Sequence, residues 1–484
     1  MVTSMIAGKP EGMVARTLRP NHPKSKGRKL RRRLYVCAKR SKSRRFHALY
    51  DRICRPDILE EAWNCVRRNG GSAGVDGETI VAIEMNGVAS WLDDIRVDLE
   101  TGRYRPRPVL RRYIPKADGS QRPLGIPTVR DRVVQMATKL VIEPLFEAGF
   151  HECSYGFRPE RNATQAMEAI REYGNDGFHW VYDADIAKFF DSVDHRKLML
   201  LVEERISDRR VLKLLRQWLR CGVMEDAGLK PTRVGTPQGG VISPLLANIF
   251  LNAFDRLWCH YGKELGVLVR YADDFVILCR SRRSVLTASV LVRRIMARLG
   301  LKLHPKKTKV VNLSRGREGF DFLGWHVRKC RGIQRNPRRR FVQRWPSQKA
   351  MCRIKRRIWQ LTSSAHSGQK LRDIIEWLNP LLRGWRGYFR TGNSDRKFNQ
   401  IDDYVHDRLT HWLRRRGGQR TSFDPHRWPH ARFRELGLYQ LRTTVRYPAQ
   451  ATRRRPLVSR VRENRTHGLK GGPTFRSTIR SGER

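Results

Sequence analysis

Two adjacent aspartates inside an apolar segment constrain the fold of this chain more than any other feature. Asp273 and Asp274 follow Tyr271 and Ala272, and this group lies between the apolar runs 267–269 and 275–278. Short runs rich in Val and Ile on both sides of a turn predict a β-hairpin, with residues 272–274 at its turn. Carboxylates in such surroundings are unfavourable unless a cation neutralises them, which favours a metal site. The alternative is an ordinary acidic turn, because Asp is common in turns for its own hydrogen-bonding reasons.

A third carboxylate comes from an earlier segment of the chain. Residues 181–186 predict a strand with Asp183 and Asp185 near its C-terminal end. One Asp from a strand and two from a hairpin can bind two Mg²⁺ ions roughly 3.5–4 Å apart. One ion would activate an attacking 3′-hydroxyl, and the other would hold a triphosphate. Asp191 and Asp194 come soon afterwards and fit a helix-capping role better.

Eight short motifs of this chain follow one another in the order in which one enzyme family has them. They are AGVDG (73–77), IPK (114–116) with RPLGIP (122–127), SYGFRP (154–159), the Asp185 segment, GTPQGG (235–240), YADD (271–274), GLKL (300–303) with KTK (307–309), and FDFLGW (320–325). One tetrapeptide alone is weakly specific, but chance matches do not keep their order over such a length. The chain therefore resembles the bacterial group II intron-encoded reverse transcriptases, which are also maturases.

The resemblance implies an α+β fold in the form of a right-hand polymerase. Fingers and palm with an antiparallel sheet would occupy residues 51–335, and a helical thumb/maturase domain would occupy 336–420. A basic leader (1–50) would precede them, and a basic nucleic-acid-binding segment (421–484) would follow. The leader holds a single acidic residue, so we expect it to lack a packed core of its own and to order on RNA.

The resemblance also implies that Asp185, Asp273 and Asp274 are the metal ligands and the catalytic carboxylates. A second predicted hairpin, with an Asp-Gly turn at 118–119, would place Lys116 and Arg122 on neighbouring strands. Two such cations could grip a triphosphate, and in the family they would contact the β- and γ-phosphates. The alternative is two solvated strand charges.

Three further residues are candidates for contact with the nucleotide. By resemblance, Phe190 would hold its ring against the 2′ carbon of the sugar and favour dNTPs. The alternative for both Phe189 and Phe190 is a place in the core, which is the preferred interpretation for Phe189. Gln238 precedes two glycines that let the backbone approach a ligand, at the start of a helix predicted around 245–250, and it would touch the nucleotide or a template base. Lys307 is the candidate proton donor to pyrophosphate, with Lys302, Lys306 and Lys309 close in sequence.

Charge identifies the class of partner independently of the motifs. Lys and Arg number 99 against 46 Asp and Glu, a formal net charge of +53. Such an excess predicts binding to a large structured RNA, weakened steeply by salt. No apolar run is long enough for a bilayer, so no membrane partner is expected. Nine scattered cysteines without a CxxC pair favour a reducing compartment, the bacterial cytoplasm with nucleoid association.

Two arginine groups are the predicted RNA contacts, and both lie after the last motif. The first is a basic linker, with Arg335, Arg338, Arg339 and Arg340. The second group interleaves Arg with aromatics along a predicted helix, and it comprises Arg383, Arg386 and Arg390. Its aromatics are more typical of a core, and the alternative is stacking on bases. Helical spacing predicts three helices between about 354 and 415.

The sequence therefore predicts a group II intron-encoded RNA-directed DNA polymerase that copies intron RNA into cDNA and assists splicing as a maturase. Its partners would be the intron RNA, dNTPs, two Mg²⁺ ions and a DNA target or primer. The last cysteine is Cys352, so no HNH nuclease is expected, and the primer would come from elsewhere, for instance a replication fork. The alternatives are an RNA-binding maturase without polymerase activity and a host-adopted defence reverse transcriptase. The intact aspartates, with Lys116, Arg122 and Gln238, favour the first reading.

Overall fold

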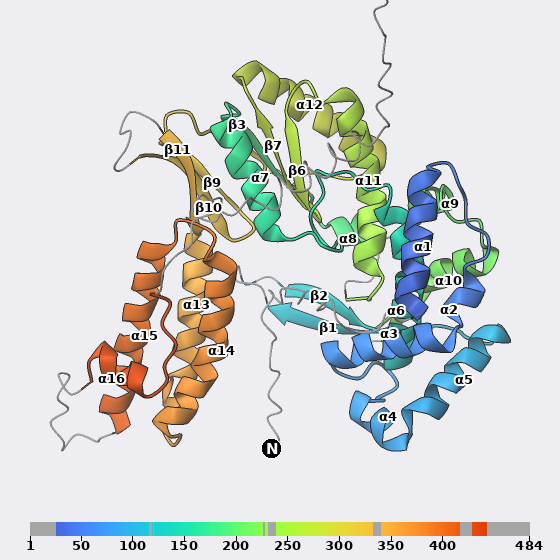
Figure 1. Cartoon of the computed structure of the whole chain (residues 1–484), viewed down its shortest axis with the longest axis horizontal. Coiled ribbons are helices and arrows are strands. Elements are labelled where there is room, and N and C mark those ends of the chain that lie inside the picture. The colour runs from blue at the N-terminus through green and yellow to red at the C-terminus, as the bar shows by residue number, and fades with distance from the viewer. Residues whose placement is uncertain are drawn as a thin grey trace, which may run out of the picture. The chain divides into compact units, whose positions relative to one another are not determined.

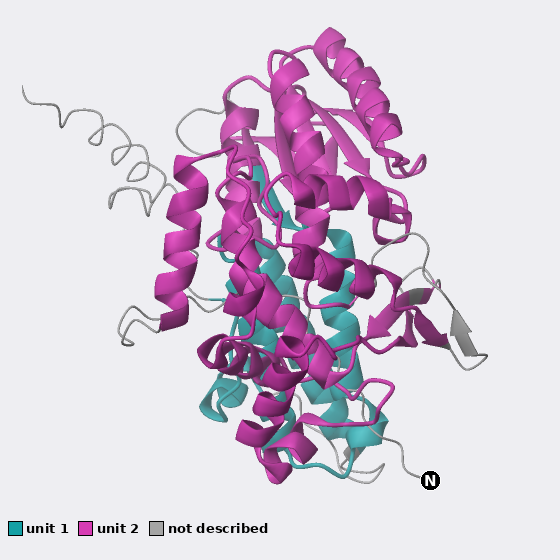
Figure 2. Cartoon of the chain, turned by 90° about the vertical axis from the view of Figure 1, so that its right-hand side faces the viewer, with its two compact units in different colours: residues 1–13, 321–327, 343–484 teal, residues 14–320, 328–342 magenta. Residues whose placement is uncertain are grey.

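The computed structural model describes residues 26–115, 119, 121–225, 228–230, 239–332, 340–416 and 428–442. The chain forms two compact units, which Figure 2 shows in different colours. Among the described residues, unit 2 comprises those from 26 to 320 and from 328 to 342, and unit 1 comprises 321–327 and those from 343 to 442. Among the described residues, no helix has the length and apolar character needed to cross a bilayer.

The central sheet of unit 2 has the strand order β6-β7-β3-β8, and its neighbours pair antiparallel (Figure 1). Its strands are β3 (Trp180–Asp185), β6 (Val267–Tyr271), β7 (Asp274–Cys279) and β8 (Lys309–Asn312). After Asp274 every residue of β7 is buried, which is the pattern of a strand covered on both faces. Helix α12 packs on β3 and β7, and α7 packs on β6 and β7. The antiparallel sheet predicted for the palm is present.

A second sheet of unit 2 has the order β2-β1-β4-β5. Its strands are β1 (Val109–Pro115), β2 (Gln121–Ile126), β4 (Val223–Glu225) and β5 (Gly228–Lys230). The predicted hairpin around Gly119 is confirmed, since β1 and β2 pair antiparallel with Ile114 opposite Arg122.

Ten further helices of unit 2 surround these sheets with α7 (Ala163–Asn175) and α12 (Arg282–Leu299). They are α1 (Lys26–Arg40), α2 (Tyr50–Ile53), α3 (Pro56–Asn69), α4 (Ile80–Asn86), α5 (Val88–Glu100), α6 (Val129–Glu147), α8 (Phe189–Ser192), α9 (His195–Glu203), α10 (Arg209–Arg220) and α11 (Ser243–Tyr261). Capping side chains mark where several begin: Thr128 for α6, Asp194 for α9 and Ser281 for α12 each accept a backbone N–H of the first turn.

Helix α1 corrects the expectation for the basic leader. Leu30, Leu34 and Ala38 are buried in the hydrophobic core of unit 2, and α1 packs against α6. An apolar residue at every fourth position gives this Arg-rich helix one face that the core can cover. Residues 26–40 are therefore folded without RNA, and residues 1–25 lie outside the described part of the chain.

Unit 1 is largely helical. Its helices are α13 (Gln348–Leu361), η1 (Ser364–His366), α14 (Leu371–Phe389), α15 (Asp395–Arg416) and α16 (His430–Glu435). The three helices predicted between 354 and 415 are confirmed, and α13 packs against both α14 and α15. A three-stranded sheet of order β11-β10-β9 has residues in both units; its strands are β9 (Gly319–Phe322), β10 (Trp325–Arg331) and β11 (Arg340–Pro346).

Candidate active site

One edge of the central sheet brings the three predicted carboxylates together. Asp185 is the last residue of β3 and pairs with Asp274, the first residue of β7. In the hairpin β6–β7, Tyr271 pairs with Asp274, so Ala272 and Asp273 form the turn between the strands. Ala272 adopts a left-handed conformation with φ of 57°, as tight hairpin turns require. The predicted hairpin is thus present, although Asp274 belongs to the strand and not to the turn.

The carboxylates repel one another when no cation is bound. The pKa of Asp274 is raised to about 7, chiefly because the surrounding protein excludes water, and then because Asp273 and Asp185 are charged. Asp274 still reaches solvent at the sheet edge, and its carboxyl group hydrogen-bonds Asp185. A divalent cation would relieve this repulsion, so the charge of the group suits a metal ion.

The carboxylates alone do not enclose an ion. Within the described ranges, no group of three or more His, Cys, Asp or Glu side chains is arranged to hold a metal. Mg²⁺ usually takes one or two carboxylates and completes its octahedral shell with water and substrate phosphates. The residues therefore fit an open site, in which substrate would supply several of the ligands.

Lys307 lies at this edge as predicted. Its ammonium group donates a hydrogen bond to Asp185 Oδ2 at 2.8 Å, although the side chain is 61% exposed. The backbone N–H of His304 donates to the carbonyl of Asp185, so the segment that carries Lys307 is fixed against β3. Lys309 instead approaches Asp183 at 3.8 Å. The structure thus distinguishes Lys307 from a neighbouring lysine that the sequence left as an alternative.

A fully buried ion pair supports the hairpin turn from inside. Arg270 precedes Tyr271, and its guanidinium donates to Asp255 of α11 at 2.7 and 2.5 Å. Both side chains are 0% exposed. Burial alone would lower the pKa of Arg270, but the Asp255 carboxylate outweighs this effect and the pKa is raised. The same guanidinium donates to the carbonyl of Ala272 at 2.9 Å, so a neutralised buried charge fixes the turn that carries Asp273.

The loop at 154–157 closes the other side of the turn. A β-carbon on Gly156 would lie 2.9 Å from the carbonyl carbon of Tyr271 and still closer to the amide of Ala272. Asn248 of α11 donates to the Gly156 carbonyl at 2.8 Å and accepts from Arg270 at 3.1 Å. Gly156 therefore permits a backbone approach that any other residue would obstruct.

The sequence predictions missed the supporting residues Asp255, Arg270 and Asn248. The available signal was a charge among apolar neighbours, because Arg270 follows Leu268 and Val269 in a buried strand. A buried arginine needs an acid, but fifteen residues separate it from Asp255, so only the packing of α11 against the hairpin identifies the pair.

Of the two phenylalanines after β3, Phe189 is confirmed as a core residue, and Phe190 packs against that core while staying partly exposed. Phe189 is 2% exposed and belongs to the core, where its ring lies 6.3 Å from that of Phe250. Phe190 is partly buried, with its ring perpendicular to that of Phe189 at 5.3 Å. Asp194 caps α9 by accepting the Lys197 N–H, which confirms its predicted capping role. Asp191 lies in the first turn of α8.

Most of the predicted triphosphate-binding site lies outside the described residues. Lys116 and Gln238 lie outside them, and of Arg122 only the backbone is described, in β2. The described part of the 235–240 motif includes Gly239, with φ of 112°. A β-carbon there would lie 2.5 Å from the Gly125 carbonyl, so this glycine permits a close approach to β2. The segment that follows Gln238 and the strand that holds Arg122 are thereby neighbours.

Of the predicted RNA contacts, Arg335, Arg338 and Arg339 lie outside the described residues, and Arg340 begins β11. In unit 1, Arg383 and Arg390 are exposed. Arg386 instead donates to the carbonyl of Leu441 at 3.2 Å and to the Tyr439 hydroxyl, which is a contact within the unit.

The aromatics interleaved with these arginines pack on one another. The rings of Trp385 and Phe389 lie 4.9 Å apart, and Trp325 contacts Phe389 at 4.8 Å. Tyr388 donates its hydroxyl to the carbonyl of Leu323 at 2.8 Å. The core interpretation of these aromatics is therefore the one that the structure supports.

Comparison with known proteins agrees with this geometry. Residues 114–327 match the family described as reverse transcriptase (RNA-dependent DNA polymerase), and residues 351–428 match the group II intron maturase-specific domain. Protein YkfC of Escherichia coli is 34% identical over 66% of this chain and 93% of its own length. The group II intron-encoded protein LtrA of Lactococcus lactis is 36% identical over 44% of this chain, and the match spans 35% of LtrA.

A nuclear intron maturase of Arabidopsis thaliana is 28% identical over 42% of this chain and 24% of its own length. A polymerase match that ends at residue 327 and a maturase match that starts at residue 351 occur here in one polypeptide. The chain thus belongs to the group II intron-encoded reverse transcriptases, RNA-directed DNA polymerases that carry a maturase domain.

Proposed function

We propose that this protein copies intron RNA into cDNA at the sheet edge formed by Asp185, Asp273 and Asp274, and that it assists splicing of the same intron. The observation that carries the proposal is the pairing of Asp185 with Asp274, which places acids from two distant segments at one edge. The raised pKa of Asp274 supports a requirement for a cation there.

Asp185, Asp273 and Asp274 would hold two Mg²⁺ ions, which when bound supply an activated 3′-hydroxyl and charge neutralisation on the triphosphate. Lys307 already donates to Asp185, and as an exposed ammonium group it is placed to give a proton to departing pyrophosphate. Phe190, directly after β3, would exclude a ribose hydroxyl from the sugar position. Lys116, Arg122 and Gln238 complete the proposed nucleotide site.

The helical unit supports the second half of the proposal. We assign residues 51–335 to fingers and palm, 336–420 to a thumb/maturase domain, and 421–484 to a basic nucleic-acid-binding segment. The maturase-family match at 351–428 and the exposed Arg383 and Arg390 support RNA contact by this unit. Splicing itself would be RNA chemistry, and the protein would bind and hold the folded intron. The primer and the DNA target are partners of the same proposal.

The test is primer extension on an RNA template with dNTPs and Mg²⁺. Wild type is compared with Asp273→Ala and with Asp93→Ala, which removes an exposed carboxylate from α5. We expect wild type and Asp93→Ala to synthesise cDNA, and Asp273→Ala to bind RNA without synthesis. Equal synthesis by all three would overturn the assignment of the carboxylates. No synthesis by any of them, with intron binding and splicing assistance retained, would establish a maturase without polymerase activity.

A further inference from the structure

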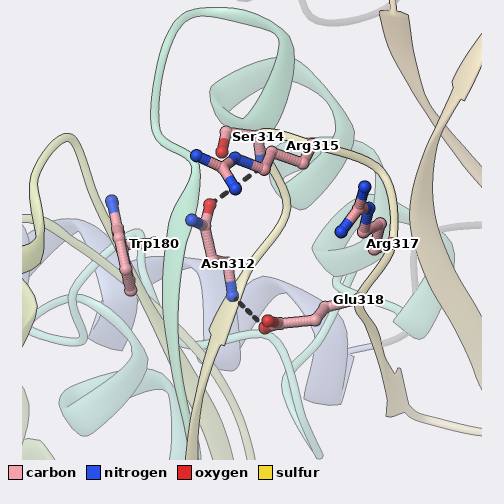
Figure 3. A pocket seen from close by; sticks show the side chains of 6 residues that line it. All are labelled: Trp180, Asn312, Ser314, Arg315, Arg317 and Glu318. Carbon is pink, nitrogen blue, oxygen red and sulfur yellow. Dashed lines mark hydrogen bonds between the residues drawn. The ribbon is translucent and has the colours of Figure 1, made fainter.

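The end of β3 opposite Asp185 carries a pocket that the polymerase site does not use. Trp180 begins this strand, where it pairs with Asn312 of β8 and with Cys279 of β7. Five strand positions separate Trp180 from Asp185, which is roughly 17 Å at the usual rise of an extended chain. The cavity has a volume of about 410 Å³ and is lined by Trp180, Asn312, Ser314, Arg315, Arg317 and Glu318 (Figure 3).

The loop that forms one wall is held in a defined conformation. The side chain of Asn312 accepts the Ser314 N–H at 2.9 Å, and the Asn312 N–H donates to Glu318 at 2.7 Å. Leu313 is fully buried, and its N–H donates to the carbonyl of His179, the neighbour of Trp180. Gly316 completes the turn with φ of 65° and donates to the Leu313 carbonyl at 3.1 Å. The positions of the two loop arginines are thus set by the backbone.

The pocket carries excess positive charge. Arg315 and Arg317 are exposed, and neither makes an ion pair or a side-chain hydrogen bond with any residue in the described parts of the chain. A third guanidinium, that of Arg340, lies 3.0 Å from where a β-carbon on Gly316 would be. The one acid of the pocket is Glu318, whose carboxylate is engaged by the backbone of Asn312.

The pocket combines the aromatic face of Trp180 with the guanidinium groups of Arg315 and Arg317, and such a combination can bind a nucleotide. In Figure 3, Trp180 and Arg317 lie on opposite sides of Asn312, and the guanidinium of Arg315 lies above the Asn312 side chain. A base stacks on an indole, and guanidinium groups bind phosphate oxygens in a bidentate manner. We propose that this pocket binds one unpaired nucleotide of a nucleic-acid strand, with the base on Trp180 and the phosphate at Arg315 and Arg317.

Two features of the pocket limit which nucleotides it can bind. The faces of paired bases are covered by their neighbours in a duplex, so a base that stacks on Trp180 must come from a single-stranded segment or an end. The Glu318 carboxylate accepts hydrogen bonds, which favours a base with an exocyclic amino group over uracil. Because the pocket shares no residue with the carboxylate edge, a strand bound there does not compete directly with a nucleotide at Asp185.

The test is ultraviolet photo-cross-linking of the full chain to a short single-stranded cytidine-rich RNA, followed by mass spectrometry of the peptides. We expect an adduct on the peptide that contains Trp180 or on the peptide that contains Ser314. In parallel, fluorescence anisotropy with a cytidine-rich RNA of the same length measures affinity. We expect Trp180→Ala to weaken binding about fivefold to tenfold. Arg315→Ala with Arg317→Ala should flatten the salt dependence by roughly 0.7 to 1.4 units of log–log slope.

The matched control is Arg294→Ala with Arg298→Ala, which removes the same charge from exposed positions of α12. Trp180→Phe keeps an aromatic face, so it should retain most of the affinity. This variant distinguishes loss of base stacking from misfolding of Trp180→Ala. If AMP displaces the labelled RNA as strongly as unlabelled RNA does, the ligand of the pocket is a free nucleotide and not a nucleic-acid strand. Cross-links confined to other peptides, or equal salt slopes for the pocket and control variants, would overturn the proposal. Primer extension by wild type, run beside these assays, separates this outcome from a failure of the polymerase assignment.

Discussion

Asp255 on helix α11 and the three acids at the edge of the central sheet have opposite surroundings. Asp255 is fully buried and receives two hydrogen bonds from Arg270, so its charge is matched inside the protein. Three residues after Arg270, the hairpin turn presents Asp273 beside Asp274 and Asp185, where the exposed Lys307 donates to Asp185. The acid that supports the turn is therefore matched by a buried cation, whereas the acids at the turn repel one another.

This difference separates stability from chemistry. Removing a buried charge leaves its partner unpaired in a low-dielectric interior, whereas removing one of several like charges relieves repulsion. A substitution at Asp255 should therefore lower the free energy of unfolding. A substitution at Asp185, Asp273 or Asp274 should instead lower the rate of nucleotidyl transfer.

The largest expected effect is that of Asp274→Asn on catalysis. Loss of a metal ligand should lower the rate of primer extension by about a thousandfold or more. Because the folded-state pKa of Asp274 is raised to about 7, wild-type stability should fall as pH rises from about 4 to 7 in the absence of metal. Asp274→Asn lacks this pH-dependent loss of stability, so its melting temperature at pH 8 should equal or exceed that of wild type. A clearly lower melting temperature would contradict the comparison.

Asp255→Asn should act in the opposite way. It leaves the buried Arg270 without a matching charge, and we expect a loss of about 3–5 kcal/mol in unfolding free energy, measured by urea denaturation. Asp93→Ala, at an exposed ion pair, should change the same quantity by less than about 1 kcal/mol.

The double variant Asp255→Leu with Arg270→Met sharpens this prediction. Apolar replacement of both partners should recover much of the stability, because no charge remains buried. The hydrogen bond from Arg270 to Ala272 stays absent, so primer extension should remain slow even in the stable protein. Full recovery of both stability and rate would show that the ion pair does not position the turn.

Lys307→Met should reduce the rate constant at saturating dNTP by about a hundredfold if the ammonium group donates a proton to pyrophosphate. Lys309→Met is the control, because Lys309 approaches Asp183 and not the catalytic edge. The pH–rate profile distinguishes the roles, since loss of a proton donor removes the decline at high pH. If Lys307→Met lowers the rate but leaves the shape of the pH–rate profile unchanged, Lys307 acts as a counter-ion of Asp185 and not as a proton donor.

The smallest effect is expected for Gly156→Ala. The added methyl group meets the backbone of Tyr271 and Ala272, which cannot rotate away as a side chain could. A loss of about 1–3 kcal/mol in stability is expected from the displaced backbone, together with slower synthesis because Asp273 moves. Gly368→Ala provides the control, because a β-carbon there meets no atom within 4 Å. Equal stability and equal rates in the two variants would contradict a close approach at Gly156.

Both hairpins and the three carboxylates could be predicted from the sequence because their signals are local. Short apolar runs around Asp273 and an Asp-Gly turn signal at Gly119 indicate strand and turn by themselves, and the order of the motifs supplied the expected residue roles. Arg270 with Asp255 and Gly239 against Gly125 could not be predicted, because each contact joins elements whose packing is set by the whole core. Helix α1 was misjudged for a related reason. A basic composition suggests RNA, yet Leu30 and Leu34 face the core.

The pairing of Asp185 with Asp274 also has a consequence for the time course of synthesis. Strand β3 leaves the ribosome about 90 residues before β7 and still longer before β8, its other neighbour. At roughly 5–20 residues per second, the strand waits about 5 to 18 seconds for its first partner. During that interval its apolar edges are unpaired and the catalytic acids are separated. A chain interrupted before residue 274 has no catalytic edge, and it holds 47 of the 99 basic residues with 33 of the 46 acidic ones, a net charge of +14 out of +53. Premature termination therefore removes most of the RNA-attracting charge together with the polymerase site.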